Sequence, residues 1–196
     1  MAWRIGDGTG GHDWPDYLRA AIAAGTGANG VFGLRLMWNM LGELVADLGG
    51  AAMHGQADLL GQTFGPVQFV HLTRRDLVAQ AVSRHRAEVS GTWHLGIEQA
   101  ARPAKPDYDR AAIAGYLTEA KADNAAWADW FNANRITPFC IHYEDLAADP
   151  MATARGVLSF LDLHPLGPLH AANRRMADAT SLEWAARFRA EGLGNP

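Results

Sequence analysis

The alternation of short β-branched and aromatic runs with longer stretches of helical periodicity most constrains how this chain can fold. The short runs are residues 30–37 (GVFGLRLM), 66–73 (PVQFVHLT) and 137–143 (TPFCIHY). Strands that alternate with helices are typical of an α/β domain with a mainly parallel sheet. The chain has 196 residues, enough for one sizeable core, so a single domain over residues 1–196 is expected.

Capping residues predict where the helices begin and end. A helix from Asp13 has Pro15 near its start and Gly25 just past its end, and a second is expected over residues 39–48. An acidic cap predicts a third helix at Asp76. Three later helices are expected from Asp107, from Asp149-Pro150 and from a capping box over residues 180–183, the last ending at Gly192.

Two apolar stripes predict which helix faces are buried. The helix from Asp107 carries a stripe at three- and four-residue steps, and the helix from Asp149 carries a shorter one. The first stripe is Ile113, Leu117, Ala120, Asn124, Trp127 and Phe131, and the second is Val157, Leu158 and Leu161.

Composition excludes several classes of protein. The formal net charge of −4 argues against a broad nucleic-acid-binding surface. No apolar run approaches the roughly 18 residues of a membrane-spanning helix, and no leader pattern follows Met1, so a cytoplasmic protein is expected. The single cysteine, Cys140, excludes an internal disulfide and is expected to be a buried spectator. No metal site is expected.

Arginine dominates the basic residues. Of the 17 basic residues only two are lysines, and the planar guanidinium suits bidentate contacts to phosphate or sulfate. A high-GC codon bias explains the same composition equally well. The composition alone therefore does not distinguish an anion-binding protein from an ordinary one.

Residues 70–87 (VHLTRRDLVAQAVSRHRA) have the organisation of a ligand-binding junction. A strand ends in two arginines and an acidic helix start, and ligands of parallel sheets bind beyond the carboxyl ends of strands, near helix N-termini. Arg75 stands at that end, and Ser83 follows about two helical turns later. The alternative is that these arginines form only a solvated helix face.

Five motifs follow one another along nearly the whole chain. They are GVFGLRLMWN at Gly30, HLTRRDLVAQAVSRHRA at His71, GTWH at Gly91, YEDLAADP at Tyr143 and RRMADATSLEWAARFR at Arg174. In this order they resemble the Stf0 sulfotransferase family, whose characterised members include bacterial trehalose sulfotransferases. The resemblance implies a P-loop-type α/β fold and a sulfonate donor, 3′-phosphoadenosine 5′-phosphosulfate (PAPS), with a sugar or glycolipid hydroxyl as acceptor.

The resemblance also implies roles for individual residues. Arg75 and Ser83 resemble the pair that holds the 3′-phosphate, and Tyr143 resembles a residue beside the adenine. Arg35 stands where many sulfotransferases have a lysine near the sulfonate. Arg174 and Arg175 correspond to a late basic segment that closes over the phosphates.

The chain departs from the family pattern at its N-terminal side. A sulfotransferase of this kind begins with a strand and an RTGST-like loop that cradles the 5′-phosphosulfate. The same N-terminal part of the family carries a glutamate that resembles the general base. Residues 6–11 (GDGTGG) are glycine-rich but lack the preceding strand. Met37 replaces a catalytic histidine of animal relatives, and structural roles are expected for His71, His94 and His142. Glu144 and Asp145 are expected to fix the strand end and cap the next turn.

The first strand of the family lies inside the sheet, between the strands that end near Thr73 and Tyr143. Its absence predicts two rows of unpaired backbone groups, an edge that favours pairing with another chain and so a possible homodimer. A late start codon, a truncated chain, a strand supplied by a partner and a decayed paralogue remain alternatives. Two functions follow, a PAPS-dependent sulfotransferase or an inactive nucleotide-binding or interaction module.

Overall fold

The computed structural model describes residues 14–50, 55–91, 106–165, 167–169 and 178–192. Its internal contacts divide the chain into two compact units, residues 1–52 and 53–196. The single domain expected from the sequence stays a prediction. No helix within these described ranges is long and apolar enough to cross a membrane.

The described residues of the first unit form two helices, α1 (Trp14–Gly25) and α2 (Trp38–Asp47), as the sequence predicted to within one residue at most boundaries. The strand predicted over residues 30–37 is wrong. This segment forms one isolated antiparallel bridge, Thr26 to Phe32, and is otherwise irregular. A strand needs a partner for its backbone groups, and no neighbouring strand pairs with the rest of this segment among the described residues. Arg35 is exposed on it.

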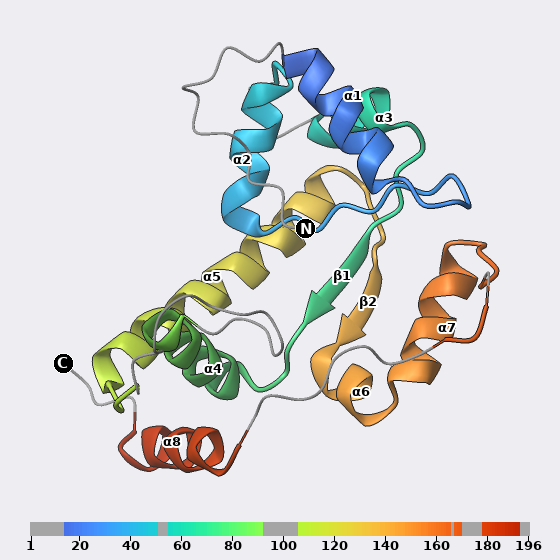
Figure 1. Ribbon diagram of the computed structural model, residues 1–196. Helices are drawn as coiled ribbons and strands as arrows, with labels where there is room; N and C mark the ends of the chain where they lie inside the picture. Colours follow the sequence, from blue (N-terminus) through green and yellow to red (C-terminus); the bar gives the residue numbers. More distant parts are fainter. Residues whose placement is uncertain (1–13, 51–54, 92–105, 166, 170–177, 193–196) are drawn as a thin grey trace. The chain divides into compact units, whose positions relative to one another are not determined.

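The second unit is built around a two-stranded parallel sheet of β1 (Val70–Thr73) and β2 (Phe139–His142) (Figure 1). The two strands lie inside the predicted runs, and the α/β class with helices flanking a parallel sheet is confirmed. The strands pair directly, with Val70 opposite Phe139 and Thr73 opposite His142. The expected gap between two unpaired strands is therefore wrong, because β1 and β2 satisfy one another's backbone groups.

Helices lie on both faces of this sheet. Phe69 and His71 contact the aromatic end of α5 (Arg110–Ala133), with a His71–Phe131 centroid distance of 5.2 Å. On the opposite face Phe139 stacks on Phe160 of α7 (Pro150–Phe160) at 5.1 Å. This opposition follows from the two-residue alternation of side chains along a strand.

Cys140 is exposed, which corrects the expectation that it is buried. Its strand, β2, pairs only with β1 among the described residues. Within that part of the chain, the strand is therefore not central in a wider sheet that would cover the thiol. Val70 and Leu72 of β1 are likewise 39% and 54% exposed.

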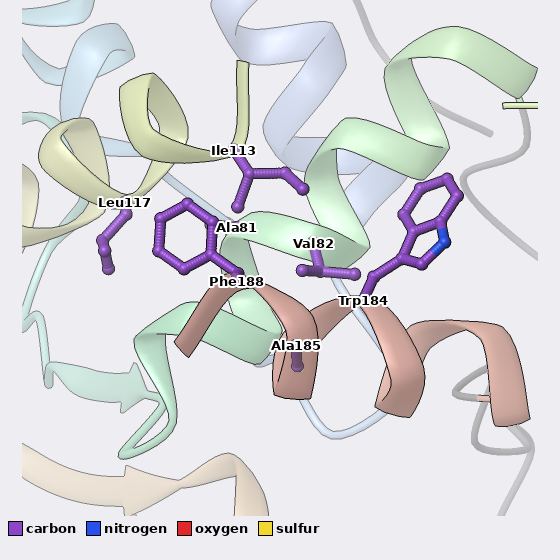
Figure 2. Close-up of a cluster of buried hydrophobic side chains, with 7 residues drawn as sticks. All are labelled: Ala81, Val82, Ile113, Leu117, Trp184, Ala185 and Phe188. Atoms are coloured by element: carbon purple, nitrogen blue, oxygen red, sulfur yellow. The ribbon is translucent and has the colours of Figure 1, made fainter. Parts of the chain in front are cut away.

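The main core lies where α4 (Leu77–Ser90), α5 and α8 (Ala179–Ala190) meet (Figure 2). Trp184, Ala185 and Phe188 of α8 pack against α4 and α5, and Phe188 points toward Leu117. The predicted α5 stripe is confirmed at four of its six positions. Asn124 and Trp127 are only half-buried, and Trp130 is buried although the stripe omitted it. The buried members are Ile113, Leu117, Ala120 and Phe131.

Side-chain caps begin most helices of this unit. Asp76, Asp109 and Asp149 each accept a hydrogen bond from the backbone three residues later, which satisfies a free amide. The predicted starts at Asp76 and Asp149 are confirmed, and α5 begins slightly after the predicted Asp107. The inward-facing residues of α7, Val157, Leu158 and Leu161, are half-buried.

The capping box predicted at Thr180 is wrong, because Asp178 is the residue that caps α8. Its carboxylate accepts from the Ser181 amide at 2.9 Å and pairs with Arg86 of α4. The predicted stop is confirmed, since Gly192 follows the helix with a φ of 67°. Two helices, α3 (Gln56–Phe64) and α6 (Tyr143–Ala148), were not predicted.

Asp178→Ala is expected to lower the free energy of unfolding by about 1 kcal/mol at pH 7, the usual cost of losing a cap. The side-chain hydrogen bond from Arg86 and the Ser181 amide hold the pKa of Asp178 well below its ordinary value of about 4. A depressed pKa means that this stabilisation is present above pH 4 and is lost as the pH falls through the depressed value. Urea denaturation at several pH values should show the wild-type and variant curves converging in acid. Asp129→Ala, an exposed change on α5, is the control.

Candidate functional site

The candidate site lies at the carboxyl ends of β1 and β2. Because the strands are parallel and in register, the segments that follow them, residues 74–76 and 143–145, emerge at the same edge of the sheet. Thr73 and His142 mark this edge, with 2.9 Å between the Thr73 hydroxyl and His142 Nδ1. The junction predicted from the sequence is therefore where α4 begins.

Glu144 occupies the N-terminus of α4. Its two carboxylate oxygens accept hydrogen bonds from the backbone amides of Arg75 and Asp76, both at 3.1 Å. Burial alone would raise the pKa of Glu144, but these amides and the charge of Arg74 lower it overall. A carboxylate thus sits where a helix N-terminus favours negative charge.

Arg75 is paired with Asp145. Its Nη1 and Nη2 atoms each donate to a different oxygen of Asp145 at 2.7 Å, an end-on bidentate contact between two half-exposed side chains. The hydrogen bonds that Arg75 donates to Asp145 raise the pKa of Arg75 above its ordinary value. A guanidinium has five N–H groups, so this contact leaves three for another acceptor.

Arg74 links the two strand ends through an aromatic contact. Its guanidinium carbon lies 4.6 Å from the ring centroid of Tyr143, and its side chain is only 17% exposed. Arg74 Nε lies 3.9 Å from the nearer Glu144 oxygen and is buried without a hydrogen-bond partner among the described residues. The guanidinium of Arg74 therefore holds the Tyr143 ring, while its Nε keeps an N–H group that has no partner among the described residues.

The histidines of this edge have structural surroundings. His71 lies among Trp127 and Phe131 of α5. Burial lowers the pKa of His71, and the charge of His142 lowers it further. Both effects favour a neutral ring. These contacts agree with the structural roles expected for His71 and His142, and His94 lies outside the described residues.

A comparison with protein-family models matches the Stf0 sulphotransferase model over residues 7–191. This chain belongs to the Stf0 family. It is 32% identical over 183 residues to the trehalose 2-sulfotransferase of Mycolicibacterium smegmatis, covering 90% of this chain and 66% of that protein. It is 33% identical over 191 residues to the trehalose 2-sulfotransferase of Mycobacterium tuberculosis, covering 93% and 69%. The chain thus spans about two thirds of the length of these curated relatives.

The structure of this Stf0 chain brings together only part of the predicted site. Arg75 and Tyr143 lie at the shared strand edge, whereas Ser83 is exposed on α4 about one and two thirds turns after Leu77. Arg35 belongs to the first unit. Arg174 and Arg175 lie outside the described residues.

Sequence reasoning missed several residues around Arg75. Arg74 could have been flagged by its adjacency, and Glu144 and Asp145 were given only a structural role at their own turn. Their partners lie 69 and 70 positions away, so local patterns do not reveal these contacts. Arg189 of α8, which donates to Asp76 at 2.6 Å, ends the motif that begins at Arg174 but was given no role from the sequence.

Proposed function

We propose that this Stf0 chain is a PAPS-dependent sulfotransferase that transfers a sulfonate to a hydroxyl group of a sugar or glycolipid. The observation that carries the proposal is Arg75, a half-exposed guanidinium with three free N–H groups at the N-terminus of α4, on the same strand edge as Tyr143. The names of the two curated relatives favour a sugar acceptor, trehalose above all.

The residues at this edge fit the nucleotide part of PAPS. A phosphate monoester needs a charged fork and a hydroxyl, which Arg75 and Ser83 would supply. The adenine needs a flat aromatic neighbour, and Tyr143 offers a half-buried ring whose position Arg74 fixes. The buried, unpartnered Nε of Arg74 is a further donor for an anionic ligand.

Each residue has one task in the proposed reaction. PAPS supplies the sulfonate when bound. Arg75 and Ser83 orient the nucleotide through its 3′-phosphate, and Tyr143 limits movement of the adenine. Arg35 stabilises the negative charge that develops on the leaving phosphate, a role that needs only a preorganised cation. Arg174 and Arg175 are proposed to close over the phosphates.

A second candidate is a nucleotide-binding or interaction module without transfer activity. The direct pairing of β1 with β2 favours it, because the family resemblance puts the phosphosulfate-binding strand between these two strands. Such a module would keep the 3′-phosphate and adenine contacts while lacking the part that activates the sulfonate.

Isothermal titration with adenosine 3′,5′-bisphosphate, with AMP as the control that lacks the 3′-phosphate, tests both candidates. A clear preference for the bisphosphate, together with a sulfonated sugar detected by mass spectrometry after incubation with PAPS and trehalose or other sugars, would support the enzyme. The same preference without product from any acceptor would support the module. Equal or absent binding of the two nucleotides would contradict both.

Asp145→Asn is expected to raise the affinity for adenosine 3′,5′-bisphosphate about threefold. The carboxylate pairs with the guanidinium that the 3′-phosphate needs, and it also repels the phosphate, though solvent screens exposed charges strongly. Titration calorimetry at low and high salt measures the effect, which should shrink as salt increases. A loss of affinity would show instead that Asp145 holds Arg75 in its binding orientation.

A further inference from the structure

A pocket lies where the start of α4 meets α5 and α8, next to the candidate nucleotide site. It has a volume of about 430 Å³, within the usual range for small-molecule sites, and its walls come from α4, α5 and α8. Arg75 is the one residue that it shares with the candidate nucleotide site, because Ser83 and Tyr143 are not among its lining residues.

The inner wall of this pocket is apolar. Leu77 and Val78 contribute from the first turn of α4, Leu117 from α5 and Phe188 from α8. Leu117 and Phe188 are 5% and 2% exposed and belong to the main core (Figure 2). Because these two side chains are fixed by core packing, this wall is formed before any ligand arrives.

The rim of the pocket is cationic. Arg75, Lys121 and Arg189 line it, against one carboxylate, Asp76. The carboxylate of Asp76 already has partners, because its Oδ1 accepts hydrogen bonds from the Ala79 amide at 3.0 Å and from Arg189 at 2.6 Å. Burial would raise the pKa of Asp76, but these contacts lower it overall. The rim keeps a net positive charge because three cationic side chains line it against this one carboxylate.

Lys121 supplies the free charge of this rim. It is exposed on α5, one turn after Leu117, so both side chains lie on the same side of the helix. No carboxylate in the described part of the chain comes within ion-pair distance of its ammonium. A ligand anion would therefore not have to displace an internal partner from Lys121.

We propose that this pocket binds an amphipathic anion, a sulfate, sulfonate, phosphate or carboxylate group attached to an aromatic ring or short alkyl chain. The apolar part would lie against the half-buried Leu77 and Val78, above Leu117 and Phe188, and the anionic group would lie at the rim, between Lys121 and Arg189. The site shares Arg75 with the proposed 3′-phosphate contacts but not Ser83, and it does not depend on the proposed transfer reaction.

Fluorescence titration with 1-anilinonaphthalene-8-sulfonate tests this site, since the probe carries one sulfonate on an aromatic system. Lys121→Met keeps the length of the side chain and removes its charge, and is expected to raise the Kd of the probe about fivefold. Lys121→Glu should raise it further. Arg155→Met, an exposed change on α7, is the matched control and should leave the Kd unchanged. Circular dichroism checks that each variant is folded.

An uncharged probe, N-phenyl-1-naphthylamine, isolates the role of charge. Its affinity should stay within about twofold in Lys121→Met, because only the sulfonate needs the ammonium. An unchanged Kd for the sulfonate in both Lys121 variants, or an equal loss for both probes, would overturn the proposal. Ser83→Ala should weaken adenosine 3′,5′-bisphosphate without affecting the sulfonate probe, so failure of this site is distinguishable from failure of the nucleotide site.

Discussion

Replacing Arg75 with alanine is expected to weaken binding of adenosine 3′,5′-bisphosphate at least about tenfold. Hydrogen bonds between a guanidinium and a phosphate are charge-assisted, and removing a pair of them costs at least about 1.4 kcal/mol. The end-on contact with Asp145 leaves three N–H groups for the phosphate, so the wild-type residue can hold both partners. Titration calorimetry of the two proteins measures the ratio of dissociation constants.

The control for this experiment is Arg155→Ala on α7, which removes an exposed arginine that is not one of the residues of the candidate site. AMP gives a second control, because it lacks the group that Arg75 would bind. The pair with Asp145 is exposed, so its loss should change the free energy of unfolding little. Unchanged affinity for the bisphosphate in a folded Arg75→Ala protein would reject this placement of the 3′-phosphate.

Trp130→Ala is expected to lower the free energy of unfolding by about 3–5 kcal/mol. The Trp130 side chain is 1% exposed and lies among Phe69, Trp127 and Phe131, so truncation leaves a large cavity next to β1. Its Nε1 also donates to Gln56 Oε1 at 2.8 Å, which attaches the start of α3 to α5. Urea denaturation followed by far-UV circular dichroism measures the loss.

Trp130→Phe separates packing from hydrogen bonding. Phenylalanine keeps an aromatic ring but leaves Gln56 without its donor, so about 1–2 kcal/mol of the loss should remain. A decrease below about 1 kcal/mol for the alanine variant would contradict the packing described here, since so large a buried side chain cannot be removed cheaply from a dense core.

Helix boundaries were predictable where one side chain decides them. Asp76 and Asp149 each cap their own helix through the amide three residues later, a contact that depends only on local sequence. Residues 180–183 offered an equally good local pattern, yet Asp178 caps α8 because Arg86 of α4 holds its carboxylate. A tertiary contact, and not the local pattern, therefore marks the start of this helix.

Elements that depend on distant partners were not predictable in the same way. Residues 30–37 have strand-like composition but no strand to pair with in the described chain, so they remain irregular. Helix α3 begins after Gly55, at a φ of 85° and without a side-chain cap, and therefore gave no start signal. Its attachment depends on Trp130, 74 residues away.

Dependence on distant partners also limited how much of the candidate site was predictable. Arg75 and Tyr143 follow strands whose carboxyl ends must meet if the sheet is parallel, so their shared edge could be inferred. The carboxylates that bind Arg75 could not, because nothing in the sequence indicates which acid faces which base across two strand ends. Lys121 and Arg189 came together only through the packing of α5 and α8 against α4.

The contacts at the shared strand edge also bear on the order of folding. Arg75 and Glu144 are separated by 69 positions in the sequence, and the intervening chain contains α4 and α5, which pack against each other. Closing so long a loop costs conformational entropy before any strand contact compensates for it. We therefore expect α4 and α5 to associate first and β1 and β2 to pair afterwards. The binding edge would then be among the last parts of the second unit to form.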